Sequence, residues 1–259
     1  MELRRQIATR YIQPLREGGS LPALAEADDG FKYVVKFRGA GHGPKALIAE
    51  LIGGEVARAL GFKVPELVFL DIPEEFGRTE PDAEVQDLLR ASRGLNLGLH
   101  FLSSALALDP YSNSADALMA SRIVWLDSYL TNVDRTYRNT NMLEWYREPW
   151  LIDHGAALYF QHSGTAPEKA ALTPFPYIKD HLMLRNASRL DEVNAEFSKK
   201  LTPEKIDEIV DLIPDEWLES REGSPTLAEQ RDVYRVFLKT RLENSQIFTD
   251  HAKQARASL

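Results

Sequence analysis

Short β-prone runs separated by turn-forming residues dominate the first hundred positions of the chain. Residues 31–37, FKYVVKF, combine aromatic and β-branched side chains with charged positions, a composition that predicts a strand. The apolar runs 64–70 and 95–102 predict two further strands, and residues 8–16 predict either a first strand or a short helix. The sequence DDG at 28–30 is a turn signal between early runs. This part of the chain therefore favours a small sheet.

One helical pattern interrupts these strands. In residues 45–60, apolar side chains recur at helical spacing and form a broad face. Gly53 and Gly54 weaken the middle of this pattern, and Gly61 ends it. The later residues 72–93 are polar and acidic, which favours a variable surface insertion.

The second half of the chain is mainly helical. A helix is predicted from residue 114 or 116 to about 130, and a long final helix from about 226 to 251. Thr202, followed by proline and glutamate, is typical of a helix start. Between these helices, residues 144–152 predict a hairpin that turns around Glu148-Pro149.

The order of these patterns predicts an α+β, bilobal architecture in which a β-rich lobe with one helix precedes a mainly helical lobe. The N-lobe would comprise residues 1 to about 105, and the C-lobe residues 106–259. A chain of 259 residues with 44% hydrophobic side chains is long enough for a substantial core.

The composition narrows the functional classes. The chain has no cysteine, which excludes disulfides, thiolate metal sites and thiol nucleophiles. Its net charge of −8 argues against nonspecific binding to nucleic acid or to anionic membranes, which requires clustered Lys and Arg. No apolar run has the length of a membrane helix and no signal peptide is evident, so a cytoplasmic protein is expected. The absence of HExxH and GxSxG motifs leaves a zinc hydrolase or an α/β-hydrolase without support.

The strongest chemical signal lies in the polar loop after the helix that ends near residue 130. Asp134 is followed five positions later by Asn139, and Asp153 follows the predicted hairpin, directly before His154 and Gly155. Phosphoryl transfer needs a carboxylate that orients or deprotonates the attacking hydroxyl, and an amide oxygen and a second carboxylate that hold Mg²⁺ on the phosphates of ATP. Asp and Asn are also ordinary turn residues. Their joint arrangement behind a helix and a hairpin nevertheless predicts a kinase catalytic segment.

Lys36, in the strand predicted at 31–37, is the candidate for contact with the nucleotide phosphates. In protein kinases a strand lysine contacts the α- and β-phosphates and pairs with a glutamate on the following helix. Both Glu50 and Glu55 lie on the predicted helix. Lys32 shares the strand face of Lys36 and competes for the same role.

Two glycine-containing segments are candidates for covering the phosphates. Gly18, Gly19 and Ser20 combine small residues, which let backbone N–H groups approach phosphate oxygens, with a hydroxyl. Residues 39–43, GAGHG, are a rival segment. Neither matches the Walker A or the GxGxxG pattern, and a tight turn or a flexible connector explains them equally well. The two segments remain equal candidates.

Several segments of the chain resemble the HipA-like kinases, a family related to the phosphatidylinositol 3/4-kinases. They are GGSLPA, YVVKFRGAGHGPKALIAE, ARALGFKVPE, NVDRTYRNTNML and WLIDHGAAL, with weaker support from PDEWL at residues 214–218. The resemblance covers most of the chain and implies a bilobal protein-kinase-like fold that binds ATP and Mg²⁺ between its lobes. One departure is Thr136, because HipA proper usually has histidine at this position.

The resemblance also implies a role for individual residues. Ser20 falls in the segment expected to cover the phosphates. The other roles that it implies are the ATP-binding lysine for Lys36, its helix partner for Glu50, the catalytic aspartate for Asp134, and the metal ligands for Asn139 and Asp153.

The acceptor of the phosphoryl group is expected by analogy with the family alone. A serine/threonine protein kinase acting on an unidentified protein is the leading expectation. A lipid or small-molecule kinase of the same fold is one alternative, which the lack of a basic membrane-binding surface disfavours. A non-catalytic ATP-binding regulator is another, which the intact set Asp134, Asn139 and Asp153 argues against. Full-length HipA toxins are much longer, so neither a toxin role nor an antitoxin partner is inferred.

Overall fold

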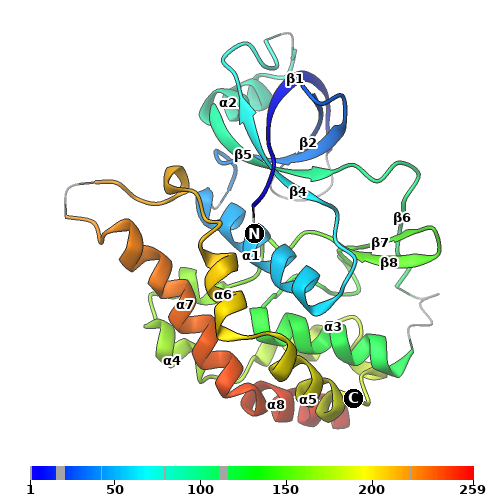
Figure 1. Ribbon diagram of the computed structural model, residues 1–259. Coiled ribbons are helices and arrows are strands. Elements are labelled where there is room, and N and C mark those ends of the chain that lie inside the picture. Colours follow the sequence, from blue (N-terminus) through cyan, green and yellow to red (C-terminus); the bar gives the residue numbers. More distant parts are fainter. Residues whose placement is uncertain (1, 16–20, 42, 79, 111–115, 222) are drawn as a thin grey trace.

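A β-barrel with one long helix beside it precedes a mainly helical lobe in the computed structural model (Figure 1). The structure describes residues 2–15, 21–41, 43–78, 80–110, 116–221 and 223–259. The arrangement confirms the predicted α+β architecture with a sheet lobe before a helical lobe. The predicted division near residue 105 stays a prediction.

Five strands close the barrel in the order β1-β2-β3-β5-β4. Neighbouring strands are antiparallel except β1 and β4, which run parallel. Because side chains alternate along a strand, Tyr33 and Val35 are buried in the barrel core, whereas Val34 and Lys36 lie on the opposite face of β3. The strands are β1 (Arg5–Pro14), β2 (Ala23–Ala27), β3 (Lys32–Lys36), β4 (Leu67–Ile72) and β5 (Gly94–His100).

Helix α1 (Pro44–Leu60) runs without a break through Gly53 and Gly54. A Cβ atom added at Gly53 would lie 2.5 Å from the Cβ of His154, and one added at Gly54 would lie 2.8 Å from Cδ1 of Leu67. Each glycine therefore permits a close approach of another segment to the helix, at the cost of some helix stability. The apolar face of α1 belongs to the same hydrophobic core as the helices of the mainly helical C-terminal lobe (the lower lobe).

The polar segment 72–93, expected to be a surface insertion, contains a helix that the sequence pattern did not reveal. Helix α2 (Ala83–Ala91) is capped by Asp82, whose carboxylate accepts a hydrogen bond from the Glu84 backbone N–H at 3.0 Å. Of its nine residues only Val85 and Leu89 are buried, so its apolar periodicity is short.

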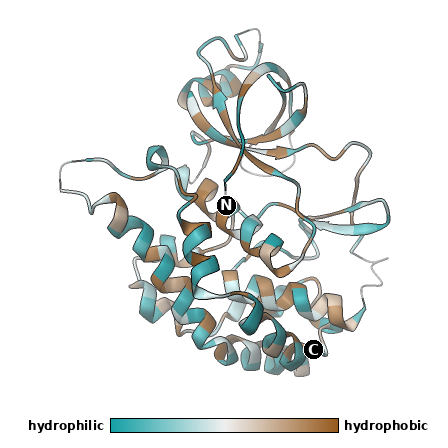
Figure 2. Cartoon of the chain, in the orientation of Figure 1, coloured by the Kyte–Doolittle hydropathy of each residue, from teal (hydrophilic) through white to brown (hydrophobic). Residues whose placement is uncertain are grey.

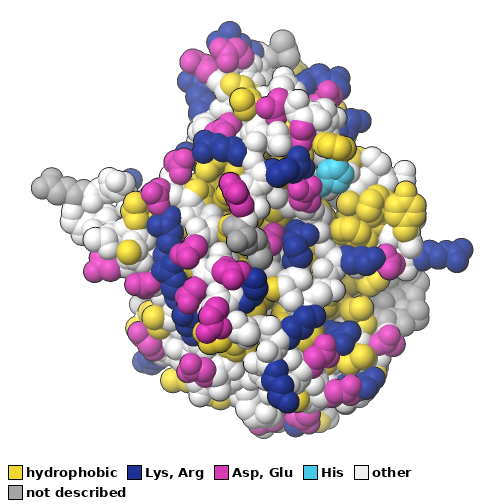
Figure 3. All heavy atoms as spheres, in the orientation of Figure 1, with side chains coloured by type: hydrophobic (Ala, Val, Ile, Leu, Met, Phe, Trp, Pro, Cys, Tyr) yellow, Lys and Arg dark blue, Asp and Glu magenta, His cyan; other side chains and the backbone are white. Residues whose placement is uncertain are grey.

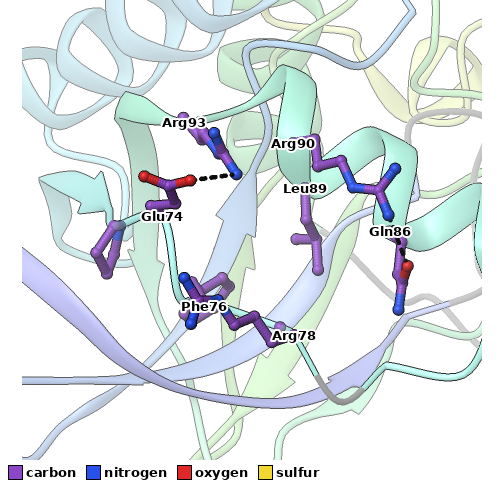
Figure 4. A pocket seen from close by; sticks show the side chains of 9 residues that line it. Glu74, Phe76, Arg78, Gln86, Leu89, Arg90 and Arg93 are labelled. Carbon is purple, nitrogen blue, oxygen red and sulfur yellow. Dashed lines mark hydrogen bonds and ion pairs between the residues drawn. The ribbon is translucent and has the colours of Figure 1, made fainter.

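A hollow of about 200 Å³ lies between α2 and the chain that precedes it (Figure 4). Arg93 pairs with Glu74 across one edge at 3.2 Å, and Leu89 points into the hollow. None of the residues predicted to be functional lines it.

The lower lobe is built around α3, which lies in the shared core cluster with Trp125 and Tyr129 fully buried. The predicted helix start at Thr202 is confirmed, because its hydroxyl accepts a hydrogen bond from the Lys205 backbone N–H at 3.2 Å. The remaining elements, with η for 3-10 helices, are β6 (Leu106–Ala107), α3 (Ala117–Leu130), β7 (Met142–Trp145), β8 (Glu148–Leu151), η1 (Tyr159–His162), α4 (Pro167–Ala171), η2 (Pro176–Asp180), η3 (Leu184–Asn186), α5 (Leu190–Lys200), α6 (Pro203–Val210), η4 (Asp215–Trp217), α7 (Leu227–Glu243) and α8 (Ser245–Ala257).

Two predicted details of this lobe are wrong. The β7–β8 hairpin turns at Tyr146 and Arg147, whose φ angles are 50° and 62°, and Glu148-Pro149 lies inside β8. Positive φ at both central residues matches the twist of a two-residue hairpin, and β8 is an edge strand that tolerates proline. The final long helix is divided into α7 and α8 at Asn244.

Side chains of the lower lobe hold the barrel and α1 in place. Trp217 donates its indole N–H to the Leu95 carbonyl at 3.0 Å and packs edge-on against Phe69 at 5.6 Å between ring centroids. Lys200 donates to the Leu60 carbonyl at the end of α1 at 2.7 Å. These contacts fix how β4, β5 and α1 sit on the lower lobe.

Hydrophobic residues lie mostly on the inner faces of the helices and strands, and hydrophilic residues lie outside (Figure 2). On the face shown in Figure 3, basic and acidic side chains are interspersed over the part of the surface that is described. Within the described residues, no helix combines the length and the apolar character needed to cross a bilayer.

Candidate active site

A cavity of about 750 Å³ lies between the barrel and the lower lobe. Val34 and Leu99 line it from the barrel, and Leu143 and Ile152 line it from the lower lobe. The chain that leaves β5, residues 100–105, provides a further wall. A largely apolar cavity of this size with a few polar groups is typical of a cofactor site.

Lys36 and Asp153 both line this cavity, and Glu50 lies behind them. The Lys36 ammonium is 2.7 Å from Asp153 Oδ1 and 3.7 Å from Glu50 Oε2. Burial alone would lower the pKa of Lys36, but the carboxylates of Glu50 and Asp153 outweigh burial and raise that pKa above its usual value. The lysine therefore keeps its charge inside the cavity.

Glu50 is almost completely buried, and neither of its carboxylate oxygens has a hydrogen-bond partner among the described residues. The ring of His154 lies beside it, with Nδ1 at 3.7 Å from Oε1. Burial, the largest effect, favours the neutral acid, but the charge of Lys36 and the neighbouring His154 together outweigh it and lower the pKa of Glu50. A buried carboxylate without hydrogen bonds is costly unless a cation compensates it. The cation that compensates the Glu50 carboxylate is Lys36, at 3.7 Å.

Asp153 lies at a sharp turn after β8. Its φ angle of 55° falls in the left-handed region, which Asp tolerates better than most residues. The preceding residue, Ile152, donates its backbone N–H to the Asn141 carbonyl at 3.1 Å. This bond ties the turn to the loop that carries Asp134.

Asp134 is held by two amides of its own loop. Asn139 donates from Nδ2 to Asp134 Oδ2 at 2.8 Å, and Asn141 donates from Nδ2 to the Asp134 backbone carbonyl at 2.8 Å and to Oδ2 at 3.3 Å. Burial raises the pKa of Asp134 above its usual value, and the negative charge of Asp153 adds to this rise against the opposing effect of the two amides. Asn141 thus holds Asp134 through both its backbone carbonyl and its side chain.

A buried ionic network centred on Asp127 of α3 anchors this loop. Arg135 donates from Nε to Asp127 Oδ2 at 2.6 Å, and Asn132 donates from Nδ2 to Oδ1 at 2.9 Å. The Nε2 atom of His181 lies 2.9 Å from Oδ2. Burial opposes ionisation of Asp127, but Arg135 and His181 outweigh it and lower the pKa of that carboxyl strongly. Arg135 also donates to the Asn141 carbonyl, so the two ends of the loop share one anchor.

The structure brings five predicted residues into two contacting groups, and Lys36 and Asp153 of the first group line the cavity. Ion pairs join the first group, and a side-chain hydrogen bond joins the second. The groups are Lys36, Glu50 and Asp153, and Asp134 with Asn139.

The predicted phosphate-covering residues Gly18, Gly19 and Ser20 lie outside the described residues. The residues Leu15 and Pro22, on either side of this segment, line the cavity. They are joined by a hydrogen bond of 2.7 Å from the Leu15 N–H to the Pro22 carbonyl.

The competing residues take other positions. Lys32 is exposed and does not line the cavity, and Glu55 pairs with Arg58 on the same helix at 3.3 Å. None of the described residues of 39–43 lines the cavity. Gly39 instead packs against α2, where an added Cβ would lie 2.8 Å from the Cβ of Ala91.

Sequence reasoning missed Asn141, Asp127 and the wall formed by residues 100–105. The repeated Asn-x-Asn pattern at 139–141 was a signal for the first. Asp127 lies four positions after the inward-facing Ile123, so helical periodicity places it on the buried face of α3. The apolar run 95–102 predicted a strand, but nothing in the sequence marks residues 100–105 as a cavity wall, because their position depends on the barrel topology.

Comparison with known proteins gives a family and a fold. A family model described as HipA-like kinase matches residues 8–248. The crystal structure of the Helicobacter pylori proinflammatory kinase CtkA is similar, with a TM-score of 0.54 at 15% identity, and the match covers 96% of this chain and 98% of that one. The crystal structure of the Golgi casein kinase with Mn and ADP bound gives a TM-score of 0.50 at 11% identity, covering 99% of this chain and 75% of that one. No curated protein matches the chain in sequence. The structural matches confirm the predicted bilobal protein-kinase-like fold.

Proposed function

The chain belongs to the HipA-like kinase family, and we propose that it transfers the γ-phosphoryl group of ATP, bound with Mg²⁺, to a serine or threonine hydroxyl of another protein. The kinase fold implies a nucleotide and a divalent metal, and the Golgi casein kinase of the same fold holds ADP and Mn in its crystal structure. The similar structure CtkA is also that of a kinase.

The observation that carries this proposal is the position of Lys36 inside the cavity. Its ammonium lies 2.7 Å from Asp153 and 3.7 Å from Glu50, although the three residues come from a strand, a helix and a turn far apart in the sequence. A lysine that only needed solvation would remain exposed, as Lys32 does on the same strand. A buried cation between two carboxylates is costly to assemble, and such arrangements concentrate at functional sites.

The described residues fit a nucleotide. Val34 and Leu143 would contact the faces of the aromatic base of the nucleotide. The ammonium of Lys36, which lines the same cavity, would bind phosphate oxygens. The carboxylate of Glu50, already paired with Lys36 at 3.7 Å, would keep Lys36 in place once the phosphates and a metal compete for Asp153. Lys36 would then pair with Glu50 instead of Asp153, so its positive charge would still have a negative partner.

Asn139 and Asp153 would hold the metal. Asn139 uses its amide nitrogen in the bond to Asp134, which leaves its oxygen available as a hard ligand. The described residues contain no group of three or more His, Asp or Glu side chains that could hold a metal by themselves. Mg²⁺ in kinases takes one or two protein ligands together with phosphate oxygens and water, so two side chains suffice. When bound, the metal would neutralise negative charge on the phosphates.

Asp134 would orient the acceptor hydroxyl and accept its proton. Its Oδ2 atom accepts from Asn139 and Asn141, which leaves Oδ1 for the acceptor. The anchor formed by Asp127 and Arg135 fixes the loop from inside the lobe. Such fixation matters because a misplacement of about 1 Å at a reacting group can cost about 100-fold in rate.

Incubation of the purified chain with γ-labelled ATP, Mg²⁺ and a cell lysate tests the proposal. We expect label on serine or threonine residues of lysate proteins, located by mass spectrometry. Asp134→Asn and Asp153→Ala should abolish transfer while the fold is retained. Asp87→Asn is the matched control, because Asp87 is exposed on α2 and pairs only with Arg90 in the described structure.

The outcomes separate the possible acceptors. Label in a lipid or metabolite fraction, with none in proteins, would refute the protein acceptor and keep the kinase chemistry. ATP binding without any transfer would refute catalysis and favour a regulator. Transfer by purified Asp134→Asn or Asp153→Ala would remove that residue from its role.

A further inference from the structure

A further pocket, of about 200 Å³ and separate from the hollow beside α2, lies on the lower lobe beside α4 and α7. These helices lie on the opposite side of the lobe from the β7–β8 hairpin (Figure 1). Its floor includes Phe160 and Phe237, whose rings stack with centroids 4.0 Å apart. Its rim includes Tyr159 and Tyr177, which are both about half exposed.

One wall of this pocket begins where the loop of Asp134 begins. Thr131 lines the pocket and lies three residues before Asp134. Its hydroxyl accepts a hydrogen bond from the Tyr159 backbone N–H at 3.1 Å. Tyr159 follows Asp153 by six residues, so this bond joins the segments that leave two proposed catalytic residues.

A second part of the lining also leads back to the loop of Asp134. Tyr177 lines the pocket beside Tyr159, with ring centroids 5.7 Å apart, and the chain after it reaches His181, which pairs with Thr136 in an isolated β-bridge. The next residue, Leu182, donates its N–H to the Arg135 carbonyl at 3.1 Å. Two of the segments that line the pocket, those of Tyr159 and Tyr177, are therefore bonded to the chain around Asp134 or lead to residues that are.

The pocket is within reach of a polypeptide whose hydroxyl lies at Asp134. Three residues span at most about 11 Å between Cα atoms, so Thr131 is no farther than this from Asp134. An extended peptide rises about 3.3 Å per residue. A side chain in the pocket would therefore belong to a residue within about five positions of the phosphorylated one.

The size and chemistry of the pocket select one kind of side chain. A cavity of about 150 Å³ lined by apolar residues holds a benzene molecule, so about 200 Å³ is enough for one phenyl or branched aliphatic group. None of the described lining residues carries a charge. Burying a charged side chain there would leave it without a partner, which is costly.

We propose that this pocket binds one apolar side chain of the protein acceptor, within about five residues of the phosphorylated hydroxyl. The inference rests on the proposed protein kinase activity and adds a substrate class to it. The substrate is a polypeptide segment that carries leucine, isoleucine, methionine or phenylalanine at one fixed distance from its serine or threonine.

A positional peptide library tests this inference. The purified chain, γ-labelled ATP and Mg²⁺ are incubated with peptides that contain one Ser or Thr and a varied residue at each of the five positions on either side. We expect one position at which an apolar residue raises kcat/KM about 10-fold or more over alanine or a charged residue. The preference should occur on one side of the acceptor only.

Two variants of the pocket and one control locate the effect. Ala170→Leu places a larger side chain in the pocket, and we expect the preference to move to alanine or valine. Tyr177→Ala removes an exposed part of the rim and should weaken the preference about 3-fold or more without affecting the fold. Tyr146→Ala is the control, because Tyr146 is 81% exposed at the hairpin turn and does not line the pocket. Its peptide preference should equal that of the wild type.

The affinity for ADP–Mg²⁺, measured by calorimetry, should be the same in all four proteins. Peptide phosphorylation without an apolar preference, or a preference that Tyr177→Ala leaves unchanged, would overturn the pocket and leave the kinase function standing. Wild-type protein that labels neither peptides nor lysate proteins would overturn the protein acceptor and the pocket together.

Discussion

Gly53 determines how closely the turn containing Asp153 approaches α1, so Gly53→Ala should separate catalysis from stability. An added Cβ would lie 2.5 Å from the Cβ of His154 and 3.0 Å from its Cγ. His154 is completely buried and directly follows Asp153, so it has little room to move without moving its neighbour.

The size of the effect follows from these distances. Carbon atoms in contact prefer about 3.5–4.0 Å, so His154 would have to move by about 1 Å or more. Displacement of a reacting group by about 1 Å can cost about 100-fold in rate. Removing a glycine from the helix interior gains about 0.5–1 kcal/mol, and overpacking costs about 1–3 kcal/mol. We therefore expect a loss of activity of about 100-fold with a loss of stability of no more than about 2.5 kcal/mol.

Gly54→Ala provides the matched control. It removes the neighbouring glycine from the same helix, but its Cβ would meet the end of the flexible Leu67 side chain, far from Asp153 in the chain. The rate of γ-phosphate transfer and the free energy of unfolding in denaturant are measured for both variants. Gly54→Ala should keep the wild-type rate within about 2-fold. A wild-type rate in Gly53→Ala would refute the reasoning that this contact positions Asp153.

Other predictions follow from the buried groups. Asp127→Asn leaves Arg135 without a counter-charge and should lower the free energy of unfolding by about 3–5 kcal/mol, measured in urea. Arg135→Lys cannot donate to both Asp127 and the Asn141 carbonyl, so transfer should slow about 10- to 100-fold while calorimetry shows unchanged ADP affinity. Burial opposes ionisation of Asp127, but Arg135 and His181 outweigh it and depress its pKa in the folded chain. Its contribution to stability is therefore complete above the unfolded-state pKa of about 4 and is lost as the pH falls below it, so the wild type should lose stability more steeply in acid than Asp127→Asn. Trp217→Ala removes a buried indole and its bond to Leu95, and it should cost about 3–5 kcal/mol in thermal or urea unfolding.

The sequence was informative wherever local chemistry and periodicity agreed. The strand predicted at 31–37 alternates between its two faces, so Val34 and Lys36 could be placed on one face, although the pattern placed Lys32 there too. The Thr202 cap and the helix after it follow from one side-chain hydrogen bond. The spacing of Asp134 and Asn139 predicted a polar loop that carries both residues, and the structure shows their side chains in direct contact.

The remaining features depend on contacts between distant segments. Two glycines in a helix indicated weakness, whereas in the structure they admit His154 and Leu67. Helix α2 was missed because it buries only two side chains and is defined by its Asp82 cap. The hairpin turn was placed at Pro149 because proline suggests a turn, but an edge strand accepts it.

The cavity walls at residues 100–105 and the pocket beside α4 could not be predicted for a different reason. Each is formed by segments that meet only after the chain has folded, and the periodicity of one segment does not reveal which other segments it meets. Asp127 is an intermediate case. Helical periodicity predicts that Asp127 is buried, but not that it pairs with Asn132 and Arg135 of the loop that carries Asp134.

A crystal structure of the wild-type chain with a non-hydrolysable ATP analogue and Mg²⁺ tests the central claim most directly. We predict a metal ion about 2.1 Å from an oxygen of Asp153 and from the amide oxygen of Asn139, with Lys36 on the phosphates and the base between Val34 and Leu143. A nucleotide bound elsewhere, or a metal held by neither Asn139 nor Asp153, would contradict the account.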